Sequence, residues 1–464
     1  MSVLRNITYV GYASTILLVT LNQSVFAAVS LKIFIYDLPK WKNWTATGNI
    51  TASDYGLDQI FPEVLKASPY VTTNPEEADY FFADAWIFWP HALNPIDDIV
   101  AEIKSQGPWF ERKGGRDHIF VITADQGRCQ YFEKSVQHAI FLQHYGGSLH
   151  GTDFFGYNLT QRWGGTFDRL MVMTEALRAN DPCSIPHIRC AEDTYGRRTP
   201  ALCHIPHQDI VVAPASFEVP ADREDCHHCF YGKHNALASK IPYLHPEAAA
   251  LMTNNRSTIL FHAGSTHFHQ DPIYSTGARQ TMIEMFGRGR KEGYLLHESG
   301  MGADYWKNLM SSVFCLATTG TGWGSRFKAG LVRGCIPVIM MDGIKNEFED
   351  ELPLMEYAIR IPGYMAFKTP QILDHFISSG RAAQMQENIK CAWRLHWWTQ
   401  PHGKALEVVM CALKMRKASR MLPGETDAAF RLRTGGRPLQ HQKIRIDFKA
   451  CTMTCEGETI NLLQ

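Results

Sequence analysis

Short apolar runs alternate with longer stretches of helical period through most of the chain. In the first half, the runs predicted to be strands are Ile33–Tyr36, Ala78–Ala83, His118–Thr123, Arg169–Met173 and Ile210–Ala213. Because helical stretches separate these runs, the strands are expected to lie parallel in one sheet that is covered on both faces. Residues 31–255 are therefore predicted to form a first Rossmann-like domain, with a Cys- and His-rich surface excursion at residues 183–229.

A second series of apolar runs follows Ser257. Its predicted strands are Thr258–His262, Tyr294–His297, Val313–Leu316, Ile336–Met340 and Tyr357–Ile361. Amphipathic stretches between them predict helices, most clearly at Arg279–Gly287 and Asp304–Ser311. Residues 256–380 are therefore predicted to form a second Rossmann-like domain, and the fold class is α/β.

The two ends of the chain depart from this alternation. Residues 381–416 have a helical pattern and are expected to pack back across both domains, whereas residues 417–464 form a tail in which periodicity fades apart from Ile444–Phe448. At the other end, residues 1–30 contain a moderately apolar segment. This segment is compatible with a signal peptide cut near Ala28 or Ser30, and also with a weak signal anchor.

A glycine-dense loop stands between two apolar runs of the second domain. The glycines let the backbone approach a ligand closely, because they carry no Cβ atom. Arg326 follows at the predicted start of a helix, where its guanidinium adds to the positive end of the helix dipole. We therefore predict a diphosphate site, with a simple packing turn as the alternative; its residues are Thr319, Gly320, Gly322, Gly324, Ser325 and Arg326.

The residues around this loop resemble the signature of exostosin-type glycosyltransferases. The matching segments are Phe314–Ala317, Gly322–Phe327 and Gly334–Ile339, followed by Asp342 and Gly343. Further segments resemble the family in the same order along the chain: Lys32–Pro39, Pro75–Phe82, Gly115–Asp125, Asp209–Pro214 and Leu260–Gly264. Several ordered matches are more specific than any single one.

The resemblance implies a GT-B fold, in which two Rossmann-like domains face each other across a cleft. It implies an inverting transfer from a UDP-sugar, held by the second domain, to a polysaccharide or glycoprotein acceptor, usually without a metal ion. It also implies a lumenal enzyme of the Golgi, either a type II membrane protein or, if residues 1–30 are cleaved, a secreted one. Gly264, Ser265 and Arg279 become further donor-binding candidates, and Asp342 is a candidate that could instead cap a helix.

Two positions depart from the family pattern. Many members have Glu three residues after the arginine, where this chain has Ala329, and related chains often have His before a strand-end aspartate, where this one has Ala124. Both differences favour an alternative function, a catalytically silent carbohydrate-binding protein that retains the GT-B fold. The intact loop up to Arg326 favours the enzyme.

An inverting transfer needs a base that takes the proton of the acceptor hydroxyl. Asp125 follows the predicted strand His118–Thr123 and is one candidate, and Asp37 after the first strand is its rival. A helix-capping carboxylate is the simpler interpretation of either residue. Three histidines, His262, His267 and His269, crowd the first loop of the second domain and could contact phosphate or acceptor.

Composition narrows the choice of partner and compartment. Lys+Arg and Asp+Glu both number 46, so no basic surface for nucleic acid is expected. Twelve cysteines fit disulfides in the secretory lumen, and we prefer disulfides to zinc for Cys226 and Cys229 of the Cys-His-His-Cys segment. Cys315 and Cys335 are expected to be free core thiols. N-glycosylation sequons stand at Asn6, Asn22, Asn43, Asn49, Asn158 and Asn255.

Overall fold

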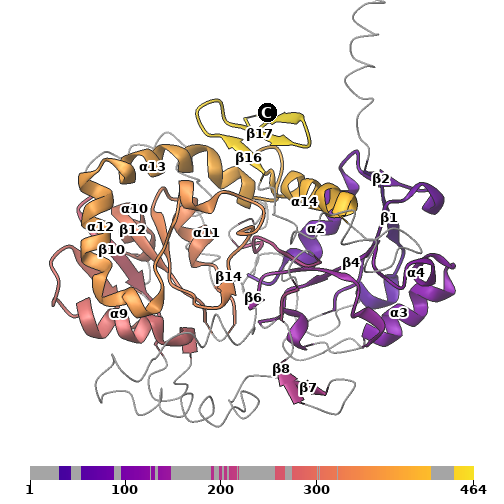
Figure 1. Ribbon diagram of the computed structural model, residues 1–464, viewed down its shortest axis with the longest axis horizontal. Helices are drawn as coiled ribbons and strands as arrows, with labels where there is room; N and C mark the ends of the chain where they lie inside the picture. The colour runs from indigo at the N-terminus through magenta and orange to yellow at the C-terminus, as the bar shows by residue number, and fades with distance from the viewer. Residues whose placement is uncertain are drawn as a thin grey trace, which may run out of the picture.

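The computed structural model contains two parallel β-sheets, each at the centre of its own lobe (Figure 1). The predicted α/β class, with two Rossmann-like domains in a GT-B arrangement, is confirmed. The residues that the structure describes are 31–42, 54–87, 96–125, 127–130, 134–147, 190–192, 198–200, 203–205, 208–216, 218, 256–266, 274–299, 301, 304–320, 322–419 and 444–463.

The first lobe, drawn in indigo and purple in Figure 1, is built on a six-stranded parallel sheet. In spatial order its strands are β2 (Val71–Thr72), β1 (Ile33–Tyr36), β3 (Tyr80–Ala83), β4 (His118–Ile122), β5 (Ile140–Gln143) and β9 (Ile210–Val211). The pattern did not predict β5, and the predicted strand at 169–173 lies outside the described residues. Among the described residues of this lobe, the α-helices are α2 (Leu57–Lys66), α3 (Ile96–Ser105) and α4 (Trp109–Arg112).

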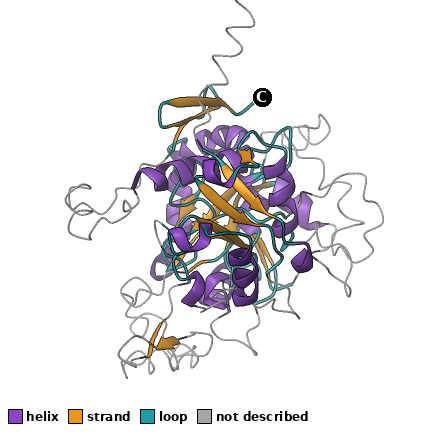
Figure 2. Cartoon of the chain, turned by 90° about the vertical axis from the view of Figure 1, so that its right-hand side faces the viewer, coloured by secondary structure: helices purple, strands orange, loops and turns teal. Residues whose placement is uncertain are grey.

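The second lobe has a five-stranded parallel sheet with the order β11 (Tyr294–His297), β10 (Thr258–Ala263), β12 (Ser312–Ala317), β13 (Ile336–Ile339) and β15 (Ile359–Arg360). Viewed from the side, helices enclose the strands of the main body (Figure 2). This is why the strands are apolar along their whole length rather than on alternate residues. The described α-helices of the second lobe are α9 (Ala278–Phe286), α10 (Asp304–Met310), α11 (Arg326–Leu331), α12 (Thr369–Ser378) and α13 (Arg381–Ala392).

Backbone pairing joins the two lobes directly. Strand β14 (Ile344–Lys345), from the second lobe, pairs antiparallel with β6 (Gly146–Gly147), from the first, and the Phe348 N–H donates to the Val211 carbonyl at 2.7 Å. The last helix, α14 (Ala405–Ser419), packs against α2 of the first lobe. There the buried Tyr80 hydroxyl donates to the Leu413 carbonyl at 2.8 Å. One buried hydrophobic cluster therefore runs through both lobes, and a second one lies within the first lobe.

The end of the chain forms a small antiparallel sheet that disulfides fasten to the helices. Its strands are β16 (Arg445–Asp447), β17 (Thr452–Cys455) and β18 (Glu458–Asn461), which lie above α14 in Figure 1. Cys391 of α13 is bonded to Cys451, and Cys411 of α14 to Cys455. The sequence pattern predicted only a tail in this segment, with periodicity at Ile444–Phe448. The disulfides explain how so short a sheet stays folded without a large core of its own.

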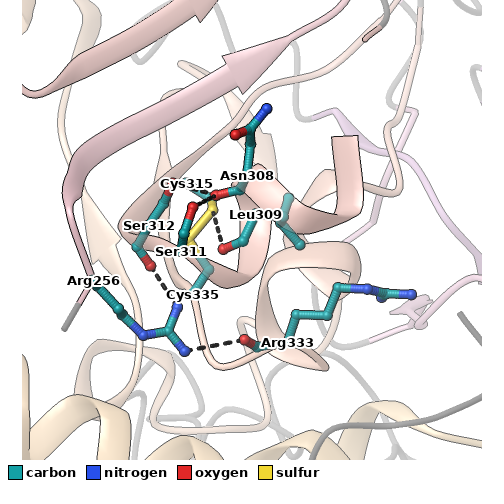
Figure 3. Close-up of a disulfide and its surroundings, with 8 residues drawn as sticks. All are labelled: Arg256, Asn308, Leu309, Ser311, Ser312, Cys315, Arg333 and Cys335. Carbon is teal, nitrogen blue, oxygen red and sulfur yellow. Dashed lines mark hydrogen bonds between the residues drawn. A yellow bond between two sulfur atoms is a disulfide. The ribbon is translucent and has the colours of Figure 1, made fainter. Parts of the chain in front are cut away.

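A third disulfide overturns one sequence prediction. Cys315 and Cys335, expected to be free core thiols, are bonded to each other, with their Cα atoms 5.8 Å apart (Figure 3). They come together because Cys335 stands just before β13, the parallel neighbour of β12. Beside the bond, Arg256 donates to the carbonyls of Ser312, at 2.5 Å, and Arg333, at 3.2 Å. The disulfide thus closes the unit that carries the glycine-dense loop.

Other cysteine and N-terminal predictions meet the limits of the described residues. Cys203 is disulfide-bonded, as expected for that region. Cys226, Cys229 and the proposed signal segment at 1–30 lie outside the described residues, as do His267 and His269. Within the described part of the chain, no helix has the length and apolarity needed to cross a membrane.

Candidate active site

The glycine-dense loop runs from the end of β12 to α11, as the sequence predicts. The residue before the helix is Ser325, and Arg326 is its first helical residue. Two glycines are required by close approach: a Cβ atom on Gly322 would lie 1.7 Å from the Asp125 carbonyl oxygen, and one on Gly324 would lie 2.8 Å from that of Thr318. Because α11 has only six residues, its dipole is small, and the arginine supplies most of the positive charge.

Arg326 lies over the carboxyl end of β10. Its Nη2 donates to the Ala263 carbonyl at 3.2 Å, and its Nε is buried without a hydrogen-bond partner among the described residues. Gly264 leaves room for the guanidinium, because a Cβ atom there would come within 2.1 Å of Nη2 and would displace the end of the arginine side chain. A buried arginine donor without a partner is costly unless a ligand completes it. The geometry therefore suits an anionic group placed between the loop and β10.

Arg279 is buried and its donors are used within the protein. They reach the Thr318 hydroxyl at 2.9 Å, the Ser265 carbonyl at 2.9 Å and the Thr319 carbonyl at 2.5 Å. These bonds tie the loop after β12 to the loop after β10. The structure thus places Ser265, Thr319 and Arg279 together, with Arg279 as the buried link between them.

Asp342 follows β13 and caps a turn of helix. Both of its carboxylate oxygens accept from the Gly363 N–H, at 3.1 and 2.9 Å, at the start of the 3₁₀ helix Gly363–Lys368. Burial raises the pKa of this carboxyl. The capping role weighed for Asp342 in the sequence is therefore present in the structure.

Trp323 connects the glycine loop to the first lobe through hydrogen bonds and ring packing. Its backbone N–H donates to the Asp125 carbonyl at 3.2 Å, and its indole N–H donates to the Thr123 carbonyl at 3.2 Å. Its ring lies 4.5 Å from the His144 ring and 5.4 Å from the Tyr55 ring. The predicted base candidate and the predicted diphosphate loop, which lie far apart in the sequence, are therefore in direct contact.

Asp54 and Tyr55, which precede α2, reach into the same junction. The Tyr55 hydroxyl donates to Asp125 Oδ1 at 2.6 Å. The Ser325 hydroxyl donates to Asp54 Oδ2 at 3.3 Å, and Ser216 donates to the other oxygen of Asp54. Sequence reasoning missed Asp54, Tyr55 and Trp323 as residues of the site. Only Trp323 had a sequence signal, because it is an aromatic residue inside a glycine-dense loop.

Asp37, the rival base candidate, is not part of this junction. Its side chain is exposed, at the end of β1. Strand β3 separates β1 from β4, so Asp37 follows a strand about 10 Å from the one that Asp125 follows. Of the two candidates, only Asp125 is brought against the glycine loop.

The electrostatic environment is set by buried cations and a neutral imidazole. Burial, together with the nearby charges of Arg326 and Arg279, holds the pKa of His262 well below its usual value. This residue is therefore uncharged at neutral pH beneath the loop. On the other side, burial raises the pKa of Asp54 despite the hydrogen bonds from Ser216 and Ser325. The alanines at the two positions that depart from the family pattern, Ala329 and Ala124, are both buried. Neither side chain adds a charge to the site.

Metal ligands are not grouped in the part of the chain that the structure describes. No cluster of three His, Cys, Asp or Glu side chains with a geometry suited to a metal ion occurs there. The groups that an anionic ligand could use at this site are the Arg326 guanidinium and loop N–H groups other than those of Gly320 and Trp323, which donate to the Trp323 and Asp125 carbonyls.

The chain is similar to known proteins over most of its length. The Exostosin GT47 domain matches residues 27–376. A probable glucuronoxylan glucuronosyltransferase of Arabidopsis thaliana, IRX7, is 24% identical over 391 residues, covering 78% of this chain and 70% of the relative. A second probable glucuronoxylan glucuronosyltransferase of that plant is 22% identical over 397 residues, with coverage of 79% and 68%. The probable glucuronosyltransferase GUT1 of Oryza sativa subsp. japonica is 25% identical over 351 residues, with coverage of 71% and 67%.

Proposed function

The chain belongs to the exostosin GT47 family of glycosyltransferases, and we propose that it moves a sugar from a UDP-sugar to a polysaccharide with inversion at the anomeric carbon. The relatives are named as glucuronosyltransferases, two of them as acting on glucuronoxylan. UDP-glucuronic acid is therefore the first donor to test. A glycoprotein acceptor remains in the proposal as the second acceptor class.

One observation carries the proposal: the glycine loop that ends in Arg326 is docked directly on Asp125 of the other lobe. A transferase needs a group that stabilises the leaving diphosphate and a base that faces the acceptor. Arg326 has a buried donor without a partner in the described residues, and Asp125 adjoins Gly322 of the same loop. The two roles therefore fall on residues that the fold holds at one place.

In the proposed step, an acceptor hydroxyl attacks the anomeric carbon from the face opposite the diphosphate. Its proton moves to the Asp125 carboxylate, the new C–O bond forms, and the bond from the anomeric carbon to the diphosphate oxygen breaks. UDP leaves with the electron pair, and Arg326 and the loop N–H groups stabilise its charge. We propose that no metal ion takes part and that Gly264, Gly320, Gly324 and Ser325 complete the donor site.

We further propose that the enzyme works in the Golgi lumen, tethered by residues 1–30 unless they are cleaved. Disulfide bonds are formed by Cys203, Cys315, Cys335, Cys391, Cys411, Cys451 and Cys455, which supports an oxidising compartment. Microscopy of a fluorescent fusion beside a Golgi marker tests this placement. A cytosolic distribution would contradict it.

The function is tested with UDP and with variants of Arg326. We expect UDP to raise the melting temperature of the purified protein with or without chelator, because a ligand of the folded state stabilises it by mass action. Arg326→Ala should lose this shift and reduce kcat/KM by about 100-fold or more, whereas Arg290→Ala, at an exposed position of the same lobe, should not. Unchanged turnover by Arg326→Ala would exclude the assigned diphosphate site, and NMR of the product tests inversion.

A further inference from the structure

Tyr55 occupies an unusual position between the two lobes. It stands in the turn before α2, and its hydroxyl donates to Asp125 Oδ1 at 2.6 Å. Its ring packs edge-on against the Trp323 ring, with centroids 5.4 Å apart and planes at 74°. One side chain thus contacts both the base candidate of the first lobe and the diphosphate loop of the second.

The hydrogen bond from Tyr55 distinguishes the two oxygens of Asp125. Oδ1 accepts from Tyr55, whereas Oδ2 accepts no hydrogen bond from any described residue. Asp54, the other carboxylate at the junction, has both oxygens occupied by Ser216 and Ser325. A carboxylate with one oxygen held and the other available can take a proton from a substrate in a fixed direction.

The backbone of Asp125 is fixed as firmly as its side chain. Its carbonyl accepts from the Trp323 N–H at 3.2 Å and abuts Gly322, where a Cβ atom would lie 1.7 Å away. The main chain therefore sets the position of Asp125 relative to the loop, and the torsion of the side chain is what remains to be fixed. The Tyr55 hydroxyl is the group that restrains it.

We propose that Tyr55 is a positioning residue for the transfer, and this rests on the proposed function above. Its hydroxyl holds Asp125 Oδ1 so that Oδ2 faces the acceptor hydroxyl. During transfer the acceptor proton goes to Oδ2, and Tyr55 keeps its own proton. The packing of Tyr55 on Trp323 fixes the orientation of the Asp125 carboxylate relative to the glycine loop.

The test is a double-mutant cycle with Tyr55→Phe and Asp125→Asn, measured on the full chain with UDP-glucuronic acid and a xylan oligosaccharide. Phenylalanine keeps the ring packing on Trp323 and removes only the hydroxyl. We expect Tyr55→Phe to lower kcat at least 10-fold with the KM for donor within about twofold. In the Asp125→Asn background, the same change should have no further effect.

A matched control removes a phenol hydroxyl elsewhere. Tyr36 is hydrogen-bonded to His118 at 2.9 Å in the core of the first lobe, so Tyr36→Phe should change stability while kcat stays within about twofold. Melting temperatures of all variants verify that they fold. A loss of kcat by Tyr55→Phe that persists in full in the Asp125→Asn background would show a general structural effect and overturn the proposal.

The outcomes separate the two levels of inference. Lack of turnover by the wild-type chain with every UDP-sugar would reject the proposed donor class. Full activity of Asp125→Asn would reject Asp125 as the base, and with it the role of Tyr55. Activity of the wild type, loss in Asp125→Asn and normal kcat in Tyr55→Phe would reject the role of Tyr55 alone.

Discussion

Glu218 and Lys328 form a buried ion pair whose disruption should be costly. Lys328 belongs to α11, two residues after Arg326 in the sequence. Neither side chain of the pair is exposed. Lys328 also donates to the Pro214 carbonyl at 2.6 Å, and Glu218 accepts from the backbone N–H groups of Trp398 and Thr399 at 2.7 and 2.8 Å. The pair therefore holds α11 to the first lobe and to the segment before α14.

The magnitude follows from burial. Desolvation raises the pKa of the Glu218 carboxyl even though Lys328 lies beside it, so the pair adds little net stability as a whole. Removing one partner leaves the other buried without compensation. Glu218→Gln should lower the free energy of unfolding by about 3 to 5 kcal/mol. The double variant with Lys328→Met should cost at least about 2 kcal/mol less than the sum of the single changes.

Urea denaturation of the purified chain at pH 7, followed by tryptophan fluorescence, measures these differences. Glu387→Gln is the control, because it breaks an exposed pair with Lys390 and should cost well under about 1 kcal/mol. A cost for Glu218→Gln no larger than that of the control would refute the reasoning. So would single-variant costs that simply add in the double variant.

Three further predictions concern the same junction. Burial lowers the pKa of His144 to about 4 in the folded protein, whereas it is about 6.5 in an unfolded chain. Acid therefore protonates the unfolded state first, and the free energy of unfolding should fall below pH 6.5, by about 2 kcal/mol at pH 5. His144→Gln should flatten this dependence of stability on pH, which denaturation at several pH values measures. Replacing Cys315 and Cys335 by alanine, which opens a loop of 20 residues, should cost about 3 kcal/mol and weaken UDP binding in the thermal-shift assay. Gly322→Ala places a Cβ atom 1.7 Å from the Asp125 carbonyl, so turnover should fall sharply in a chain that still folds; wild-type kcat would contradict the docked loop.

Local pattern was enough to predict many of the elements. Ile33–Tyr36 and Tyr294–His297 were predicted with the bounds that β1 and β11 have, because each is a short apolar run with polar or helical neighbours. The start of α11 at Arg326 also follows from the loop before it. Strand β5 was missed because Ile140–Gln143 lies in a segment with no turn residue marking its start.

Tertiary contacts decided what the pattern did not predict. Cys315 and Cys335 were interpreted as free thiols because they lie in apolar segments, and the sequence alone does not give the register that brings their sulfur atoms together. Tyr55 and Trp323 were passed over because an aromatic side chain is usually a core residue. Trp323, for example, meets Thr123, 200 residues away in the sequence, only where the lobes join, and no local propensity encodes such a meeting.

The strand pair between the lobes has a consequence for how the chain is made. The Tyr80 hydroxyl can form its hydrogen bond only after Leu413, 333 residues later, has been synthesised. Strand β6 likewise can pair only after β14 has been synthesised. At a synthesis rate of about 5 to 20 residues per second, the roughly 200 residues from the end of β9 to Leu413 take about 10 to 40 seconds, and the first lobe remains incomplete for that time after its own strands have emerged. The lobes are thus separate in topology but not in folding. Chimaeras that exchange one lobe at residue 256 would inherit an unpaired sheet edge and an uncovered core.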